Sequence, residues 1–80
     1  MKATITKMEP FAADYVHLKI EGAESKSDAE SFIQGIRHFD DATIHYIEDN
    51  EDGSYAVVLR GEINLSKLFE GQTISEGEEL

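Results

Sequence analysis

The chain has 80 residues, with 17 acidic residues against 7 basic ones, no cysteine, and a formal net charge of −10. Its length predicts one domain, and the lack of cysteine excludes a disulfide framework and a thiolate metal site. So negative a field repels nucleic acid and acidic membranes and attracts basic surfaces. No apolar run approaches the ~18 residues of a membrane span, and the N-terminus lacks the apolar block of a signal peptide. We therefore expect a cytoplasmic protein that binds neither membrane nor nucleic acid directly.

Two segments near the N-terminus have the alternating pattern of half-buried strands. The first covers residues 3–8 and is interrupted by Glu9 and Pro10, because proline cannot donate to a strand ladder. In the second, residues 15–21, the side chains of Val16, Leu18 and Ile20 share one face, and polar and aromatic residues share the other. These segments predict an antiparallel hairpin with a long connection.

A helix is predicted next. Ser27 and Glu30 have the spacing of a capping box, in which the serine side chain and the glutamate side chain satisfy backbone amides of the first turn. Apolar residues recur at helical spacing from Ala29 to Phe39 and form one stripe. The pattern predicts a helix that begins at Ser27 and ends before Asp40.

A second hairpin is predicted from two apolar runs, residues 44–47 and 55–59, that flank a turn ending in Asp52 and Gly53. Simple alternation places Ile44 with Tyr46 on one face, and His45 on the other. The run 55–59 is apolar on both faces, which is typical of a central or doubly covered strand. We expect residues 63–69 to provide that cover.

The order of these elements is β-β-α-β-β. It predicts an α+β fold of two layers, with a four-stranded, mainly antiparallel sheet and one helix on one face. We expect residues 1–71 to form this single domain. Residues 72–80, with two glycines nearby and three acids, are expected to be a mobile acidic tail.

The sequence shows no motif for catalysis. The turn carboxylates are solvated, whereas a general acid and base need an enclosed site that separates their pKa values. Residues 48–53 resemble half of an EF-hand loop, but the position of the bidentate glutamate is occupied by Leu59. His17 and His45 give only two ligands with any common geometry, whereas a zinc site needs three or four. We expect no catalytic residue, no metal and no cofactor.

A protein-binding surface is the remaining prediction. Acids two apart on a strand project to the same side about 6.6 Å from each other, and such a row can meet a basic groove. Aromatic residues surrounded by charge are common in interfaces. The residues expected to bind a partner are Asp40, Asp41, Glu48, Asp49, Glu51, Asp52, Tyr15 and His45.

The chain resembles the small anti-defence proteins of phages, namely the anti-CRISPR and DNA-mimic anti-restriction proteins. The resemblance lies in its size, its charge of −10, and its acidic runs at residues 40–41, 48–52 and 76–79. It matches no specific family motif, so no residue role is carried over. It implies a non-enzymatic inhibitor, a monomer or homodimer in the host cytoplasm. Its partner would be a basic protein, such as a nuclease or a CRISPR effector subunit, whose nucleic-acid-binding surface it occupies.

Three alternatives remain open. The same acids would serve an immunity protein or antitoxin that blocks a basic nuclease. A small regulatory or scaffold module would need the charge only for solubility. A small enzyme would need a closed polar cavity around His17 or His45.

Overall fold

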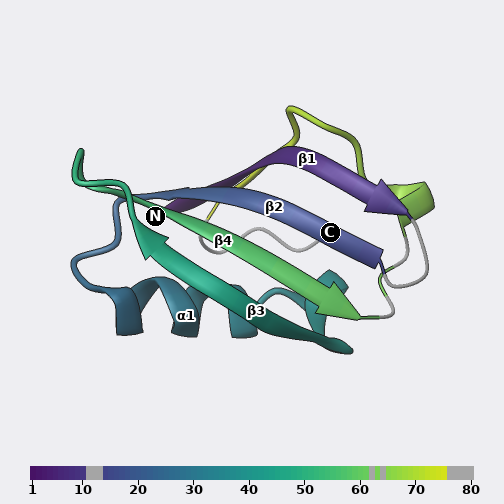
Figure 1. Ribbon diagram of the computed structural model, residues 1–80, viewed down its shortest axis with the longest axis horizontal. Helices are drawn as coiled ribbons and strands as arrows, with labels where there is room; N and C mark the ends of the chain where they lie inside the picture. The colour runs from purple at the N-terminus through teal and green to yellow at the C-terminus, as the bar shows by residue number, and fades with distance from the viewer. Residues whose placement is uncertain (11–13, 62, 64, 76–80) are drawn as a thin grey trace.

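The computed structural model describes residues 1–10, 14–61, 63 and 65–75. It is an α+β fold, in which α1 packs against one side of an antiparallel sheet (Figure 1). The elements are β1 (Lys2–Pro10), β2 (Asp14–Glu21), α1 (Lys26–Gln34), the 3-10 helix η1 (Arg37–Phe39), β3 (Ala42–Asp49), β4 (Ser54–Gly61), the 3-10 helix η2 (Leu65–Lys67) and β5 (Thr73–Ser75). No helix in these residues has the length and apolar character needed to cross a membrane.

The sheet has the strand order β3-β4-β2-β1-β5, and all neighbouring pairs are antiparallel. The two predicted hairpins, β1–β2 and β3–β4, are both present. Because β4 lies between β2 and β3, these two strands run parallel to each other without pairing. The connection through α1 therefore places β3 at one edge of the sheet, and β4 is an inner strand.

The sheet has five strands, so the expectation of four was wrong. The additional strand, β5, pairs with β1 and lies within the segment that we expected to be a tail. Its Ile74 is opposite Ala3, and both side chains are buried. The amide of Ile5 donates to the carbonyl of Gln72 (2.8 Å), which continues this pairing. Three residues carry too little periodicity to reveal a strand, and residues 76–80 lie outside the described part.

The core lies between the sheet and α1. It combines inward-facing residues of β1, β2 and β4 with Ala29 and Ile33 of α1. Ile63 and Leu68, from the segment expected to cover β4, belong to this same cluster. The cover is thus on the helix side, and the other face of the sheet has no layer over it among the described residues.

The N-cap of the helix lies two residues earlier than predicted. Ser25 is the N-cap, and its hydroxyl accepts a hydrogen bond from the amide of Asp28 (3.1 Å). The carboxylate of Asp28 accepts one from the amide of Glu24 (3.0 Å). The capping interaction therefore uses Ser25 and Asp28 rather than Ser27 and Glu30. Both pairs have the three-residue spacing of a capping box, so the sequence alone did not decide between them.

The helix also ends earlier, with Gly35 as its C-cap. Glycine has a poor helix propensity, and Ile36 after it adopts an extended conformation (φ −87°, ψ 118°). The chain then forms η1, which returns Phe39 to the core. The apolar stripe was thus interpreted correctly as core, but it does not lie on one continuous helix.

A bulge in β3 overturns the predicted alternation of that strand. The register shifts between Ile44 and Tyr46, because His45 is an extra residue opposite β4. Ile44 and Ile47 consequently both pack against the core, while Tyr46 lies on the opposite face and is 48% exposed. A comparable irregularity between Ile5 and Lys7 allows β1 to continue to Pro10 instead of ending before Glu9.

Candidate functional site

The acidic hairpin turn joins β3 to β4 and carries four of the predicted binding residues. Two of its carboxylates build the turn itself. Asp49 accepts a hydrogen bond from the amide of Glu51 (2.8 Å), and Asp52 accepts one from the amide of Ser54 (2.9 Å). Asn50 closes the loop, because its backbone N–H donates a hydrogen bond to the carbonyl of Ser54 (3.0 Å). These contacts give the turn a defined shape.

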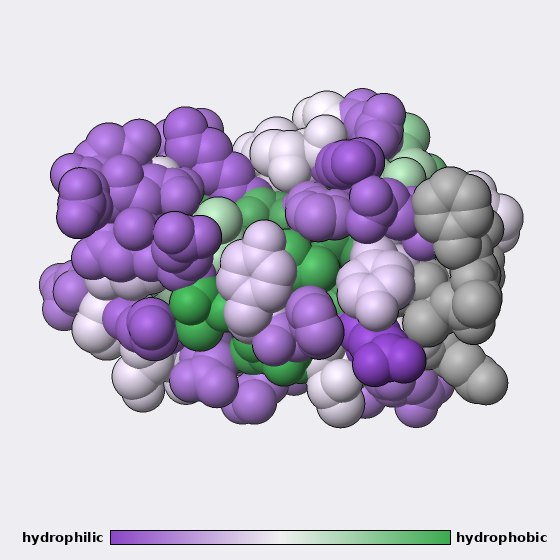
Figure 2. Space-filling model, viewed as in Figure 1, coloured by the Kyte–Doolittle hydropathy of each residue, from purple (hydrophilic) through white to green (hydrophobic). Residues whose placement is uncertain are grey.

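The other two turn carboxylates are free to meet a partner. Glu48 and Glu51 are exposed, and neither side chain has a polar partner among the described residues. Hydrogen bonds from Ser54 hold the pKa of Asp52 below its usual range, so this carboxylate stays ionised to lower pH. Figure 2 shows this end of the molecule as a continuous hydrophilic surface.

Asp40 and Asp41 form a second acidic group at the opposite end of β3. Asp41 and Glu48 are seven residues apart along the chain, which corresponds to about 23 Å at ~3.3 Å per residue. The position of Asp40 and Asp41 is fixed by a close approach to the end of β4, where a Cβ on Gly61 would lie 2.7 Å from the carbonyl oxygen of Asp41. The predicted acids therefore form two patches, one at each end of the edge strand β3.

A groove opens between α1, η1 and the edge strand β3. Its volume is about 450 Å³, and its lining residues are Glu30, Ile33, Gln34, Phe39, Asp40, Ala42, Thr43, Ile44 and Leu59. Of the predicted site residues, it includes only Asp40. No sequence signal indicated this groove, because Glu30 matched a capping box and Phe39 matched a helical stripe.

Tyr15 and His45 lie together on the face of the sheet opposite α1, which we call the open face. Their rings are in edge contact (centroids 5.7 Å apart), and Tyr46 adds a second edge contact to His45 (5.9 Å). The guanidinium of Arg60 lies 5.8 Å from the centre of the Tyr15 ring. Of the six predicted acids, the strand registers place only Glu48 on this face with the aromatic group, so the eight predicted residues do not make one site.

Val58 is buried beneath these aromatic residues although it is on the open face. It is 3% exposed and lies between His17 of β2 and Tyr46 of β3 in the register. In Figure 2 hydrophobic side chains appear over the middle of the sheet, framed by hydrophilic ones. Side chains of the neighbouring strands, rather than a second helix, therefore shield Val58 from solvent on the open face.

The open face has a different charge from the rest of the molecule. The strand registers place on it three glutamates (Glu9, Glu21 and Glu48) and four bases (Lys2, Lys7, Lys19 and Arg60). Its formal charge is therefore +1, whereas the other described residues, with ten acids and three bases, carry −7. Most of the described acids therefore lie away from the open face, and Glu48 is the turn carboxylate that the registers place on it.

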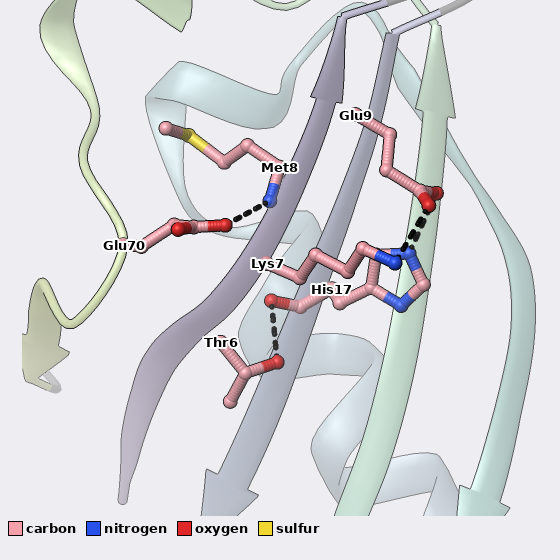
Figure 3. Close-up of polar contacts among 6 residues, drawn as sticks. All are labelled: Thr6, Lys7, Met8, Glu9, His17 and Glu70. Carbon is pink, nitrogen blue, oxygen red and sulfur yellow. Dashed lines mark hydrogen bonds and ion pairs between the residues drawn. The ribbon is translucent and has the colours of Figure 1, made fainter.

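Some of the charged side chains of the open face pair with one another in a polar cluster on β1 and β2 (Figure 3). The carboxylate of Glu9 contacts the Nε2 atom of His17 and the ammonium group of Lys7, each at 3.0 Å. The hydrogen bonds from His17 and Lys7 hold the pKa of Glu9 below its usual range. On the other side of β1, the carboxylate of Glu70 accepts a hydrogen bond from the amide of Met8 (3.0 Å).

The described residues contain no group of three or more histidine, aspartate and glutamate side chains placed to hold a metal ion. His17 is engaged by Glu9, and His45 packs in the aromatic group. The cavity described above is lined by neither histidine.

Comparison of the chain with family models, with curated proteins and with solved structures gives no significant match. Its function must therefore be argued from the charges, contacts and surfaces of its own residues.

Proposed function

We propose that this protein is a non-enzymatic inhibitor that binds a basic, nucleic-acid-binding surface of another protein through the acidic hairpin turn. The observation that carries the proposal is the division of charge among the described residues, with −7 outside the open face and +1 on it. A uniform surplus of acids would serve solubility alone. A charge concentrated away from one face favours an oriented approach to a basic partner.

The turn suits this role because its shape is set before binding. Backbone hydrogen bonds to Asp49 and Asp52 order it, and the carboxylates of Glu48 and Glu51 remain available. An ordered acidic loop loses less conformational entropy on binding than a flexible one. Proteins hold duplex DNA, with its negative charge every ~1.7 Å of axis, through Lys and Arg, and the same side chains can hold this turn.

Within this function we favour an anti-defence inhibitor directed against a nuclease or a CRISPR effector subunit. Support comes from the small size of the chain and from its acidic runs. An immunity protein against a basic nuclease would use the same surface, and identification of the captured partner separates the two.

The test is capture from a bacterial lysate at low salt, followed by elution in a salt gradient. At an ionic strength of about 0.15 M, charges more than ~8 Å apart are largely screened. We therefore expect the partner to be a basic protein that is released at moderate salt and displaced by added DNA or RNA. A partner that resists salt and ignores nucleic acid would contradict the proposal.

Variants localise the binding surface. The double variant Glu48→Gln/Glu51→Gln removes two charges and leaves the hydrogen bonds of the turn intact. Exposed ion pairs contribute about 0.2–1 kcal/mol each, so we expect affinity to fall roughly tenfold. Glu76→Gln/Glu78→Gln is the matched control, because it removes the same charge near the C-terminus. Equal losses of affinity in the two variants would contradict the assignment of the binding surface to the turn.

A further inference from the structure

We propose that the groove between α1 and β3 accepts an extended basic segment of the partner, which adds to the free edge of β3 as a further strand. This inference rests on the proposed function and names the form of the bound partner. It draws on the sheet edge, the groove and the charges around them.

The outer edge of β3 offers backbone groups for pairing. β3 is the first strand in the order of the sheet, and its only strand partner among the described residues is β4. A strand at such an edge presents unpaired N–H and C=O groups to any extended segment beside it. Addition of a peptide strand at an exposed edge is a common mode of recognition, with backbone hydrogen bonds for affinity and side-chain pockets for specificity.

The groove supplies the side-chain pocket beside that edge. Ile33, Phe39 and Ile44 provide apolar surface, and residues 42–44 of β3 form one wall. Its volume of about 450 Å³ is within the ~300–1,000 Å³ of small-ligand sites. An added strand would direct every second side chain toward α1 and into this groove.

The charges select a basic segment as the occupant. The lining contains two acids, Glu30 and Asp40, and no base. Both are exposed, and neither carboxylate has a polar partner among the described residues. Beyond the groove, Asp41 lies at one end of β3, and Glu48 and Asp49 lie at the other. A second copy of this chain, pairing edge to edge, would bring these acids against their equivalents, which disfavours a homodimer here.

The bulge at His45 limits the length of the added ladder. The register of β3 shifts between Ile44 and Tyr46, and a bulge bends its strand and interrupts regular pairing. The continuous stretch beside the groove is therefore residues 42–44. A segment of about five residues suffices to cover it, with an apolar side chain in the groove and a Lys or Arg two residues away on each side, on the same face.

Two peptides of identical composition test this geometry. In the capped peptide Lys-Thr-Val-Thr-Lys, the valine and both lysines share one face of a strand. In Thr-Lys-Val-Lys-Thr, the lysines face away from the valine. We expect the first to bind at least fivefold more tightly in an NMR titration at low salt and to protect amides of residues 42–44 from exchange. Equal affinity of the two peptides, or protection located at the hairpin turn, would overturn the inference.

Two further comparisons separate backbone pairing from charge. N-methylation of the two threonine amides and the valine amide keeps the charge of the first peptide but removes donors on both edges of the strand, and we expect at least a tenfold loss of affinity if the peptide pairs with β3. The rim variant Glu30→Gln/Asp40→Asn should weaken the first peptide more than the control Glu76→Gln/Glu78→Gln does. Indifference to N-methylation, or equal effects of the two variants, would contradict strand addition at this groove.

The same rim variant distinguishes this inference from the proposed function. If capture of the lysate partner is lost in the turn variant Glu48→Gln/Glu51→Gln and kept in the rim variant, the acidic turn stands and the groove inference fails. If the rim variant loses capture and the turn variant keeps it, the groove stands and the assignment to the turn fails.

Discussion

The carboxylates of this acidic chain have different roles that their sequence positions do not distinguish. Asp49 and Asp52 are acceptors for backbone amides of the turn, whereas Glu48 and Glu51 have no polar partner in the described structure. Glu9 is held by His17 and Lys7 on the open face. Charge-neutralising substitutions should therefore differ in their effects on stability and on binding.

Glu9 is expected to contribute to the acid sensitivity of folding. Its folded pKa is lowered from the ordinary value of 4.5, first by the hydrogen bond with His17 and then by Lys7. A lowered carboxylate pKa stabilises the fold above about pH 4.5, and this contribution is lost as the pH falls through the folded pKa. In urea unfolding between about pH 3 and pH 6, the Glu9→Gln variant should lose less stability on acidification than the wild type.

The control for this experiment is Glu51→Gln, because the Glu51 carboxylate contacts no polar group in the described structure. We expect its stability to fall with acid in parallel with the wild type. A Glu9→Gln variant with the full acid dependence of the wild type would show that the contacts of Glu9 do not stabilise the folded state.

Among the secondary-structure elements, α1 and β3 show how local signals compete. Two serines lie near the start of α1, and either fits an N-cap by residue type. The tertiary structure selects Ser25, with Asp28 completing the cap. In β3 the bulge at His45 reverses which side chains reach the core after Ile44. A one-residue shift moves every following side chain to the other face.

The capping assignment predicts unequal effects of two serine substitutions. Ser25→Ala removes the acceptor for the amide of Asp28, and loss of an N-cap costs about 1 kcal/mol of the free energy of unfolding. Ser27→Ala lies inside the helix at an exposed position, where alanine is the better helix former, so we expect a change within about 0.5 kcal/mol. Urea denaturation of the two variants measures the difference, and a larger cost for Ser27→Ala would contradict the assignment.

Taken together, the molecule combines a one-sided core with an unequal distribution of charge. All described helical segments that reach the core pack on one side of the sheet, and within the described part of the chain the open face is covered only by its own side chains. The acids are concentrated elsewhere, including both ends of the edge strand β3. Repulsion among them should oppose folding and at the same time favour binding to a basic partner.

Added salt should therefore have opposite effects on stability and on binding. Screening of repulsion among the acids is expected to raise the melting temperature between about 20 and 500 mM NaCl, whereas affinity for the proposed basic partner should fall. A gain of about 1 kcal/mol corresponds to roughly 4–8 °C for a domain of this size. Calorimetry and the salt-gradient elution measure the two effects, and a melting temperature that falls on addition of NaCl would contradict net repulsion.

The sequence by itself determined the class of fold, both hairpins, the presence of one helix and the core faces of Val16, Leu18 and Ile20. These features follow from short-range periodicity, turn residues and composition, which act within a few residues. It did not determine β5, because three residues show no period, nor the bulge at His45, because an extra residue is visible only against its partner strand. The separation of the acids into two patches, their exclusion from most of the open face and the groove between α1 and β3 were decided by strand order and packing. These depend on contacts between residues far apart in the chain.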